Sequence, residues 1–498
     1  MKISIYKIIL LAVCILTGSS CVDLSQGPKS FLSEEDYFAI DGAAEKSVPG
    51  LYWKLWKGNY AFNCRLMRLN VQADDIIVSP TKPGNLLNNI ANLSPALMAN
   101  NPDFSNLWEN FMEVICESNR LIAYTPIAND NSKKTLKVKA IVGEAYFMRA
   151  LAYLYTVRIF GDAPMLIHPK EAAVDMPRES VESIYTKMIV PSLERAMEWL
   201  PEVSRTGDSG SPTKWAAKAC LADAYMSMAG WPLHKTECYE KAMNLSLEII
   251  NSNRYELMGD YASLWKEENK ADPREFIFTL QHSVANKVPS QYGKSFYPID
   301  FYPNAGWADY YGDLEFFNSY PNDDRKKWNY MTEWQVQDPV TKEGRIISYT
   351  ESNDKLPAIS KYYDYDNGQP SKSQLSNGVT SIYRYADVLL TYAEASVLAK
   401  GIVDDLALEC LNKVQNRANS IVTLTKDAKE FEEAVFNEKG WEFFAEMRRW
   451  FDLVRKEKVG AVRPQVWNNS FYKAQGHYYF PIPQGEIDLT NWNNNKGY

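Results

Sequence analysis

An aromatic-rich segment, residues 296–334, is the part of the sequence best suited to bind a ligand. Thirteen of its 39 residues are aromatic, whereas 13% of the whole chain is aromatic. Nine of the thirteen are Trp or Tyr, and they are set among Gly, Pro, Asn and Asp. A Trp or Tyr ring can cover the apolar C–H face of a sugar while its polar tip stays in water. Nearby Asp, Asn and Arg side chains then take the hydroxyl groups.

The sequence therefore predicts a ligand site built from Tyr302, Trp307, Tyr310, Tyr311, Trp328 and Trp334. We expect Trp307, Tyr310, Tyr311 and Trp328 to be partly exposed and near one another. A contribution to the core, or to the interface with a partner protein, is the alternative for each of them.

The sequence contains only weak matches to the motifs of catalytic and metal-binding sites. Residues 207–211, Gly-Asp-Ser-Gly-Ser, are similar to the nucleophile loop of a serine protease, but no His or Asp stands in a recognisable partner motif. The four histidines are isolated, and there is no HExxH motif. Residues 364–368 are out of register with a calcium-binding loop, so structural calcium stays an open alternative. We predict that the chain is not an enzyme and has no cofactor.

The first residues resemble a secretory signal. Lys2 and Lys7 precede an apolar run at 8–16. Small residues at 17–20 follow the run, and Cys21 comes directly after them. The run is shorter than the ~20 residues that a membrane-spanning helix needs. A Cys directly after small residues favours a bacterial lipoprotein signal at 1–20, with acyl chains on Cys21 and a tether at 21–32. A secreted protein with a free thiol at Cys21 is the alternative.

Charge and cysteine content exclude several classes of protein. Lys and Arg number 54 against 62 Asp and Glu, and no basic stripe is present, so nucleic acid is not an expected partner. After cleavage five widely spaced cysteines would remain, without a CxxC motif. This odd number argues against a disulfide framework and favours buried free thiols.

Helical periodicity dominates the rest of the chain. The spacing of apolar residues predicts helices at 137–160, 180–200, 213–229, 235–251, 384–400, 405–418 and 430–456. Several form antiparallel pairs with small and aromatic residues at tetratricopeptide-like positions. We predict a mainly α fold in one domain, 33–498. It comprises a helical half to about 281, a loop-rich ligand region at about 282–380, and C-terminal helices with a tail at 381–498.

Several motifs in order along the chain resemble the SusD/RagB family of outer-membrane lipoproteins from Bacteroidetes. They lie at residues 33–38, 144–153, 158–164, 384–390, 392–395, 443–455, 480–483 and 497–498. Many motif residues, among them Asp162, Arg384 and Glu394, have features of structural positions. The family signature therefore identifies the fold more than the ligand site.

The resemblance implies a tetratricopeptide-supported domain anchored to the outer membrane, facing outward. Such proteins act with a SusC-like TonB-dependent barrel, capture an oligosaccharide or polysaccharide, and deliver it for import. A peptide or another nutrient is the alternative ligand. The family also carries an acidic pair near Asp74 and Asp75, which the resemblance makes candidate ligand contacts; a turn or capping role is equally open.

Overall fold

The computed structural model describes residues 32–57, 62–82, 86–171, 174, 176–290, 292–303, 305–363 and 377–498. The predicted signal peptide, Cys21 and almost all of the tether lie outside the described residues. So does the 364–368 segment considered for calcium. Predictions on these segments stay predictions.

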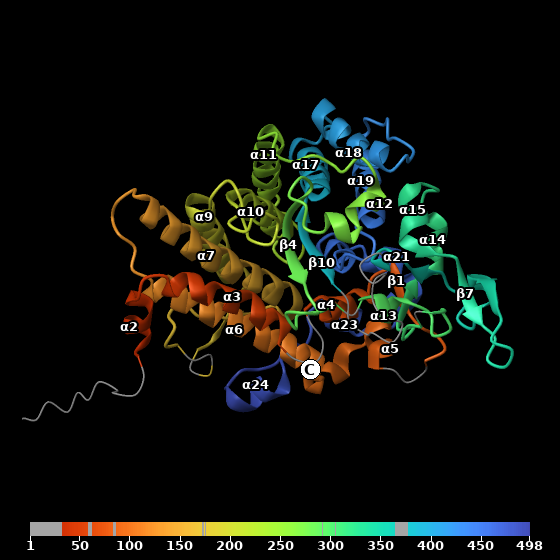
Figure 1. Cartoon of the computed structure of the whole chain (residues 1–498), viewed down its shortest axis with the longest axis horizontal. Coiled ribbons are helices and arrows are strands. Elements are labelled where there is room, and N and C mark those ends of the chain that lie inside the picture. Colours follow the sequence, from red (N-terminus) through yellow and green to blue (C-terminus); the bar gives the residue numbers. More distant parts are fainter. Residues whose placement is uncertain are drawn as a thin grey trace, which may run out of the picture.

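Helices of 6 to 28 residues form the N-terminal part of the molecule (Figure 1). They are α2 (Glu34–Ala39), α3 (Ala43–Trp56), α4 (Phe62–Asn70), α5 (Leu86–Ala91), α6 (Pro102–Tyr124) and α7 (Lys133–Phe160). α7 begins one turn earlier than predicted because the Ser132 hydroxyl accepts from the Thr135 N–H at 3.2 Å and caps the helix. It ends at Gly161 as predicted, and the φ of 75° at Gly161 favours glycine.

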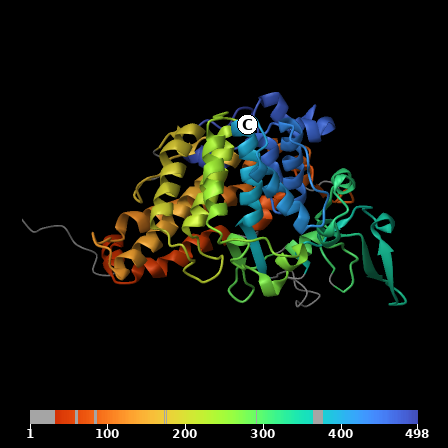
Figure 2. The ribbon, with the colours of Figure 1, turned by 90° about the horizontal axis from the view of Figure 1, so that it is seen from above.

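Helices pack side by side in sequence order on the other side of α7 (Figure 2). They are α8 (Val181–Ile184), α9 (Val190–Trp199), α10 (Lys214–Ala229), α11 (Cys238–Asn251), α17 (Tyr385–Lys400), α18 (Asp405–Arg417) and α19 (Ala428–Glu442). α10 contacts α11, α11 contacts α17, and α17 contacts both α18 and α19. This is the tetratricopeptide-like stacking that the small and aromatic residues predict.

The helix predicted at 430–456 is in fact two helices. α19 ends at Glu442 and α20 (Arg449–Arg455) follows. Between them Ala445 and Met447 have positive φ of 58° and 59°, which an α-helix does not allow. The resulting turn places Glu446 inside the protein, where it accepts from buried cationic side chains.

Every sheet is a two-stranded antiparallel ribbon among the described residues. The pairs are β1 (Ile76–Val78) with β5 (Tyr310–Gly312), β2 (Ala163–Pro164) with β3 (Arg178–Glu179), β4 (Phe276–His282) with β10 (Gly378–Arg384), β6 (Tyr330–Met331) with β9 (Ala358–Ile359), and β7 (Glu333–Gln337) with β8 (Gly344–Ser348). The β7–β8 hairpin projects from the body of the molecule at the right of Figure 1.

Short helices complete the loop-rich and C-terminal regions. They are α12 (Tyr261–Leu264), α13 (Tyr292–Phe296), α14 (Leu314–Ser319), α15 (Asp324–Asn329), α21 (Val459–Val462), α22 (Pro464–Trp467), α23 (Phe471–Gln475) and α24 (Gln484–Leu489). None of the helices in the described part combines the length and apolar character that crossing a membrane requires.

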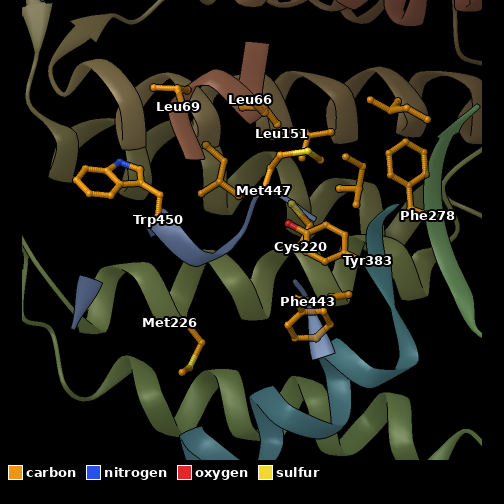
Figure 3. Close-up of a cluster of buried hydrophobic side chains, with 14 of the residues drawn as sticks. Leu66, Leu69, Leu151, Cys220, Met226, Phe278, Tyr383, Phe443, Met447 and Trp450 are labelled. Carbon is orange, nitrogen blue, oxygen red and sulfur yellow. The ribbon is translucent and has the colours of Figure 1, made fainter. Parts of the chain in front are cut away.

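The hydrophobic core joins segments that are far apart in the sequence (Figure 3). Leu66 of α4 and Leu151 of α7 lie near Cys220 of α10, with Tyr383 of β10 and Trp450 of α20 in the same cluster. Cys220 is a free, buried thiol, as the cysteine pattern predicts.

A buried ion network ties the strands to the C-terminal helices. Arg384, fully buried, donates to Glu275 (3.1 Å), Glu442 (2.5 Å) and Glu446 (2.8 Å). Burial alone would raise the pKa of Glu442. The guanidinium groups of Arg417, Arg384 and Arg325 instead hold this pKa well below its usual range. The 384–390 and 443–455 motifs are therefore structural.

Candidate ligand-binding site

Nine of the thirteen aromatic side chains in residues 296–334 are buried in the core. They are Phe296, Tyr297, Phe301, Tyr310, Tyr311, Phe316, Tyr320, Tyr330 and Trp334. The expectation that Tyr310 and Tyr311 are partly exposed is therefore wrong. Both lie on β5, which pairs with β1 and also contacts β9, and all three residues of this strand are buried.

Trp334 is also buried, and its indole has a structural partner. Its Nε1–H donates to Asp300 Oδ1 at 3.0 Å, and it lies opposite Ile347 on the buried face of the β7–β8 hairpin. Trp334 thereby fixes the turn at residues 299–302 to the hairpin. In this structure it has no surface to offer a ligand.

Four aromatic side chains of the segment keep an accessible surface. Tyr302 is 41% exposed, and Trp307, Phe317 and Trp328 are half-buried. Trp328 donates from Nε1 to the Lys361 carbonyl at 3.0 Å, so its polar edge points inward. Among the described residues, no ring contact joins Tyr302, Trp307 and Trp328 to one another.

The loop that carries Trp307 is held rigidly. The Trp307 N–H donates to the Lys294 carbonyl at 2.5 Å, and the Lys82 ammonium donates to the Trp307 carbonyl and to Asp309 (3.0 Å). A Cβ on Gly306 would lie 2.2 Å from the Tyr297 carbonyl oxygen, so the backbones approach too closely for any side chain. Trp307 is thus positioned before any ligand arrives.

Tyr302 belongs to the same loop and is attached to the hairpin. Its N–H donates to the Gln335 carbonyl of β7 at 2.8 Å. Ile299, 65% exposed, and the exposed Asp300 and Pro303 surround it in sequence. The loop therefore offers an aromatic ring and polar groups between α13 and the hairpin (Figure 1).

A carboxylate after β8, that of Asp354, connects its own segment to residues 79–81. Asp354 accepts from Ser79 Oγ (2.8 Å) and from Thr81 Oγ1 (2.7 Å). Burial, followed by the charge of Asp354, raises the pKa of Tyr311 well above its usual range. Sequence inspection missed Asp354, Lys82 and Asp309, because their partners stand more than 220 residues away in the chain.

Asp74 and Asp75, which the resemblance makes candidate ligand contacts, both have partners within the protein. Arg449 donates to Asp74 from Nε (2.7 Å) and Nη2 (2.8 Å). Asp75 is fully buried and accepts from Asn70 Nδ2 at 3.0 Å. Burial, reinforced by Asp74, raises the pKa of Asp75 to about 7. The alternative of a turn-stabilising role is the one that these contacts favour.

Catalytic geometry is not found at the serine motif. Ser209 is buried and its hydroxyl donates to the Ala271 carbonyl at 3.0 Å. Desolvation lowers the pKa of His282 to about 4, and its Nε2 lies 2.7 Å from Thr380 Oγ1. No group of three or more His, Cys, Asp or Glu suited to a metal ion occurs in the described part.

Two family models match the chain. Residues 253–498 match the SusD family, and residues 66–226 match a family described as starch-binding and associating with the outer membrane. The chain belongs to the SusD family. The resemblance drawn from the sequence motifs is confirmed, and so is the mainly α SusD-like fold.

Curated relatives match this SusD-family chain over most of its length. SusD-like protein P2 of Formosa agariphila is 24% identical, with 99% of each chain covered. A SusD-like protein of Bacteroides ovatus is 26% identical and covers 90% of this chain and 82% of its own.

Solved structures show the same fold. A SusD superfamily protein from Parabacteroides distasonis has a TM-score of 0.77 at 24% identity, covering 91% of this chain and 99% of its own. Surface glycan-binding protein A from Bacteroides thetaiotaomicron, in complex with laminarihexaose, has a TM-score of 0.74 at 21% identity, with coverage of 91% and 99%. These descriptions name binding proteins and not enzymes, in agreement with the prediction that the chain is not an enzyme.

Proposed function

We propose that this protein binds an oligosaccharide or polysaccharide at the outer membrane and passes it to a SusC-like TonB-dependent transporter for import. Family membership supports this proposal, because one matching model is described as starch-binding and associating with the outer membrane. Structural neighbours described as a surface glycan-binding protein and as a laminarin-binding SusD-like protein support glycan as the ligand.

The observation that carries the proposal is the surface at residues 297–303 and 305–309, which hydrogen bonds hold to α13 and β7. It presents Tyr302 and Trp307 at the surface, with Lys82 and Asp309 beside them. Aromatic rings cover the apolar faces of sugars, and the charged groups and exposed main-chain groups bind hydroxyls. Because hydrogen bonds fix the loop beforehand, little conformational entropy is lost when a glycan binds. Trp328 is a further contact in this proposal through its half-exposed ring.

Anchoring through Cys21 completes the proposal. Ten residues separate Cys21 from Leu32, which span at most about 40 Å when extended. Acyl chains on Cys21 would hold the domain within that distance of the membrane, close enough to meet a barrel in the same membrane. Stable anchoring needs more than one acyl chain, since each buried methylene contributes ~0.8 kcal/mol.

A binding experiment on the soluble chain starting at Val22 tests the proposal. A glycan array selects a ligand, and calorimetry measures its affinity for the parent protein, Trp307→Ala and Trp53→Ala. Trp53 is 49% exposed on α3 and serves as a matched control. We expect Trp307→Ala to weaken binding severalfold to thirtyfold, as for a contact worth up to ~2 kcal/mol.

Two outcomes would overturn the proposal. If the array shows no glycan and a peptide library binds instead, the ligand class is wrong. If Trp307→Ala lowers the melting temperature and leaves glycan affinity intact, Trp307 is a core residue and the site lies elsewhere.

A further inference from the structure

A surface pocket lies beside the C-terminal tail, away from the segment that carries Tyr302 and Trp307. It has a volume of about 470 Å³, and its walls include Met176 and Arg178 on one side and residues 491–493 on the other. The tail segment follows α24, which stands well to the left of α13 and β7 in Figure 1. None of the residues predicted from the sequence to bind ligand belongs to it.

Arg178 brings a positive charge to this pocket, and no carboxylate of the described residues forms an ion pair with it. Its guanidinium donates to three neutral acceptors: the Asp162 carbonyl (2.8 Å), the Asn493 carbonyl (2.8 Å) and Asn495 Oδ1 (2.6 Å). The Asp162 carboxylate is the nearby acid, and its Oδ1 accepts instead from the Val181 N–H at 2.9 Å.

The charge of Arg178 is therefore only partly compensated. Desolvation lowers its pKa, and the more distant Asp162 offsets this only in part. A partly buried guanidinium that contacts no anion gains electrostatically when one arrives. The planar guanidinium group of Arg178 is fixed by three hydrogen bonds, and its other N–H groups can donate to a carboxylate or a sulfate.

Trp492 adds a fixed aromatic wall. Its Nε1–H donates to the Met176 carbonyl at 2.7 Å, and its ring packs edge-to-face on Trp108 with centroids 6.2 Å apart. The ring lines the pocket and remains partly exposed. The indole is thus oriented before binding, which lowers the entropic cost of stacking a ligand on it.

Two exposed amide side chains, Asn491 and Asn493, line the same pocket. An amide offers both a donor and an acceptor, which matches a sugar hydroxyl. An apolar ring wall, a cation and two amides together fit a sugar ring that carries an anionic group. We propose that this pocket is a second carbohydrate site, for an acidic sugar such as a uronic acid or a sulfated sugar.

Calorimetry on the soluble chain starting at Val22 tests the proposal with three named probes. They are an oligogalacturonate, a sulfated carrageenan oligosaccharide and neutral laminarihexaose. We expect at least one acidic probe to bind, and its affinity to fall at least fivefold between 50 and 500 mM NaCl. Binding of that probe should weaken at least tenfold in Arg178→Gln and in Trp492→Ala. The control Arg195→Gln removes an exposed arginine on α9 and should change nothing.

Because Arg178 also holds the tail, melting curves accompany each variant. Asn491→Ala, which changes an exposed side chain, provides a second variant that leaves those contacts in place and should weaken binding at least twofold. The proposal is overturned if neither acidic probe binds at 10 mM, or if Asn491→Ala and folded Arg178→Gln bind as the parent does. It is also overturned if Trp307→Ala, rather than these variants, abolishes binding. If the parent protein binds an acidic probe but not neutral laminarihexaose, the result counts against the glycan site at Tyr302 and Trp307 and not against this pocket.

Discussion

Replacing Arg384 with alanine should destabilise the protein more than any surface substitution. Arg384 is fully buried and donates five hydrogen bonds, to Glu275, Glu442 and Glu446, including the Glu442 carbonyl. The variant removes the cation that the three buried carboxylates share and leaves Arg417, Arg325 and Lys361 to compensate their charge. Removing one partner of a buried ion pair typically costs ~3–5 kcal/mol, because the remaining charge is buried without compensation.

That cost converts into a modest change in melting temperature because the chain is long. The entropy of unfolding is about 2.1 cal/mol/K per residue, so an ordered chain of ~470 residues has roughly 1 kcal/mol/K. A loss of ~3–5 kcal/mol then lowers the melting temperature by about 3–5 °C. Differential scanning calorimetry at pH 7 resolves a shift of this size.

Arg345→Ala is the matched control for this measurement. The Arg345 side chain is 69% exposed and lies 3.7 Å from Glu351, and such a pair contributes ~0–1 kcal/mol. Its melting temperature should stay within about 1 °C of the parent. If Arg384→Ala has the same melting temperature as the Arg345→Ala control, the buried ion network does not stabilise the fold as we infer.

Four further outcomes are expected. Gly306→Ala should weaken glycan binding at least tenfold, because the new Cβ would lie 2.2 Å from the Tyr297 carbonyl oxygen. The control Gly259→Ala has open space around the new Cβ and should bind glycan as the parent does. Equal affinities of the two variants in calorimetry would count against a fixed loop. The folded pKa of Asp75, about 7, lies above its unfolded value near ~4, so the stability that its protonated form contributes is lost as pH rises through 7. The melting temperature of Asp75→Asn, measured relative to that of the parent, should therefore rise between pH 5 and pH 8. A constant difference between the two melting temperatures would refute this sign. Cys21→Ser should move the protein from the membrane fraction to the soluble fraction, and unchanged fractionation without lipid mass on that residue would contradict acylation. Incubation with the bound glycan should release no products, and turnover above ~1 s⁻¹ would show an enzyme.

Local signals in the sequence predicted α7–α11 and α17–α20, but not α6 or the short helices of the loop-rich region. Ser33 and Thr213 cap α2 and α10, since each hydroxyl accepts from an N–H three residues on. Gly161 ends α7 for a reason visible in the sequence, its freedom to adopt positive φ. The break between α19 and α20 was not predictable, because Ala445 and Met447 are ordinary helix formers held in a turn by tertiary contacts.

The candidate site was predicted only in part, since burial depends on distant segments. Tyr310 and Tyr311 are buried on a strand that pairs with β1, which stands more than 230 residues earlier in the chain. The ion pair of Asp74 with Arg449 could not be predicted either, because 375 residues separate the two in the chain. Trp307 and Tyr302 remain accessible because their loop runs over the surface beside the β7–β8 hairpin.

A crystal structure of the soluble chain with the oligosaccharide selected by the glycan array tests the central claim most directly. The account predicts a sugar ring in contact with Trp307 or Tyr302, within about 4.5 Å of the aromatic carbons, and a hydroxyl bonded to a polar group of the same loop. A sugar bound elsewhere, with neither ring in contact, would contradict the claim that this loop is the glycan site.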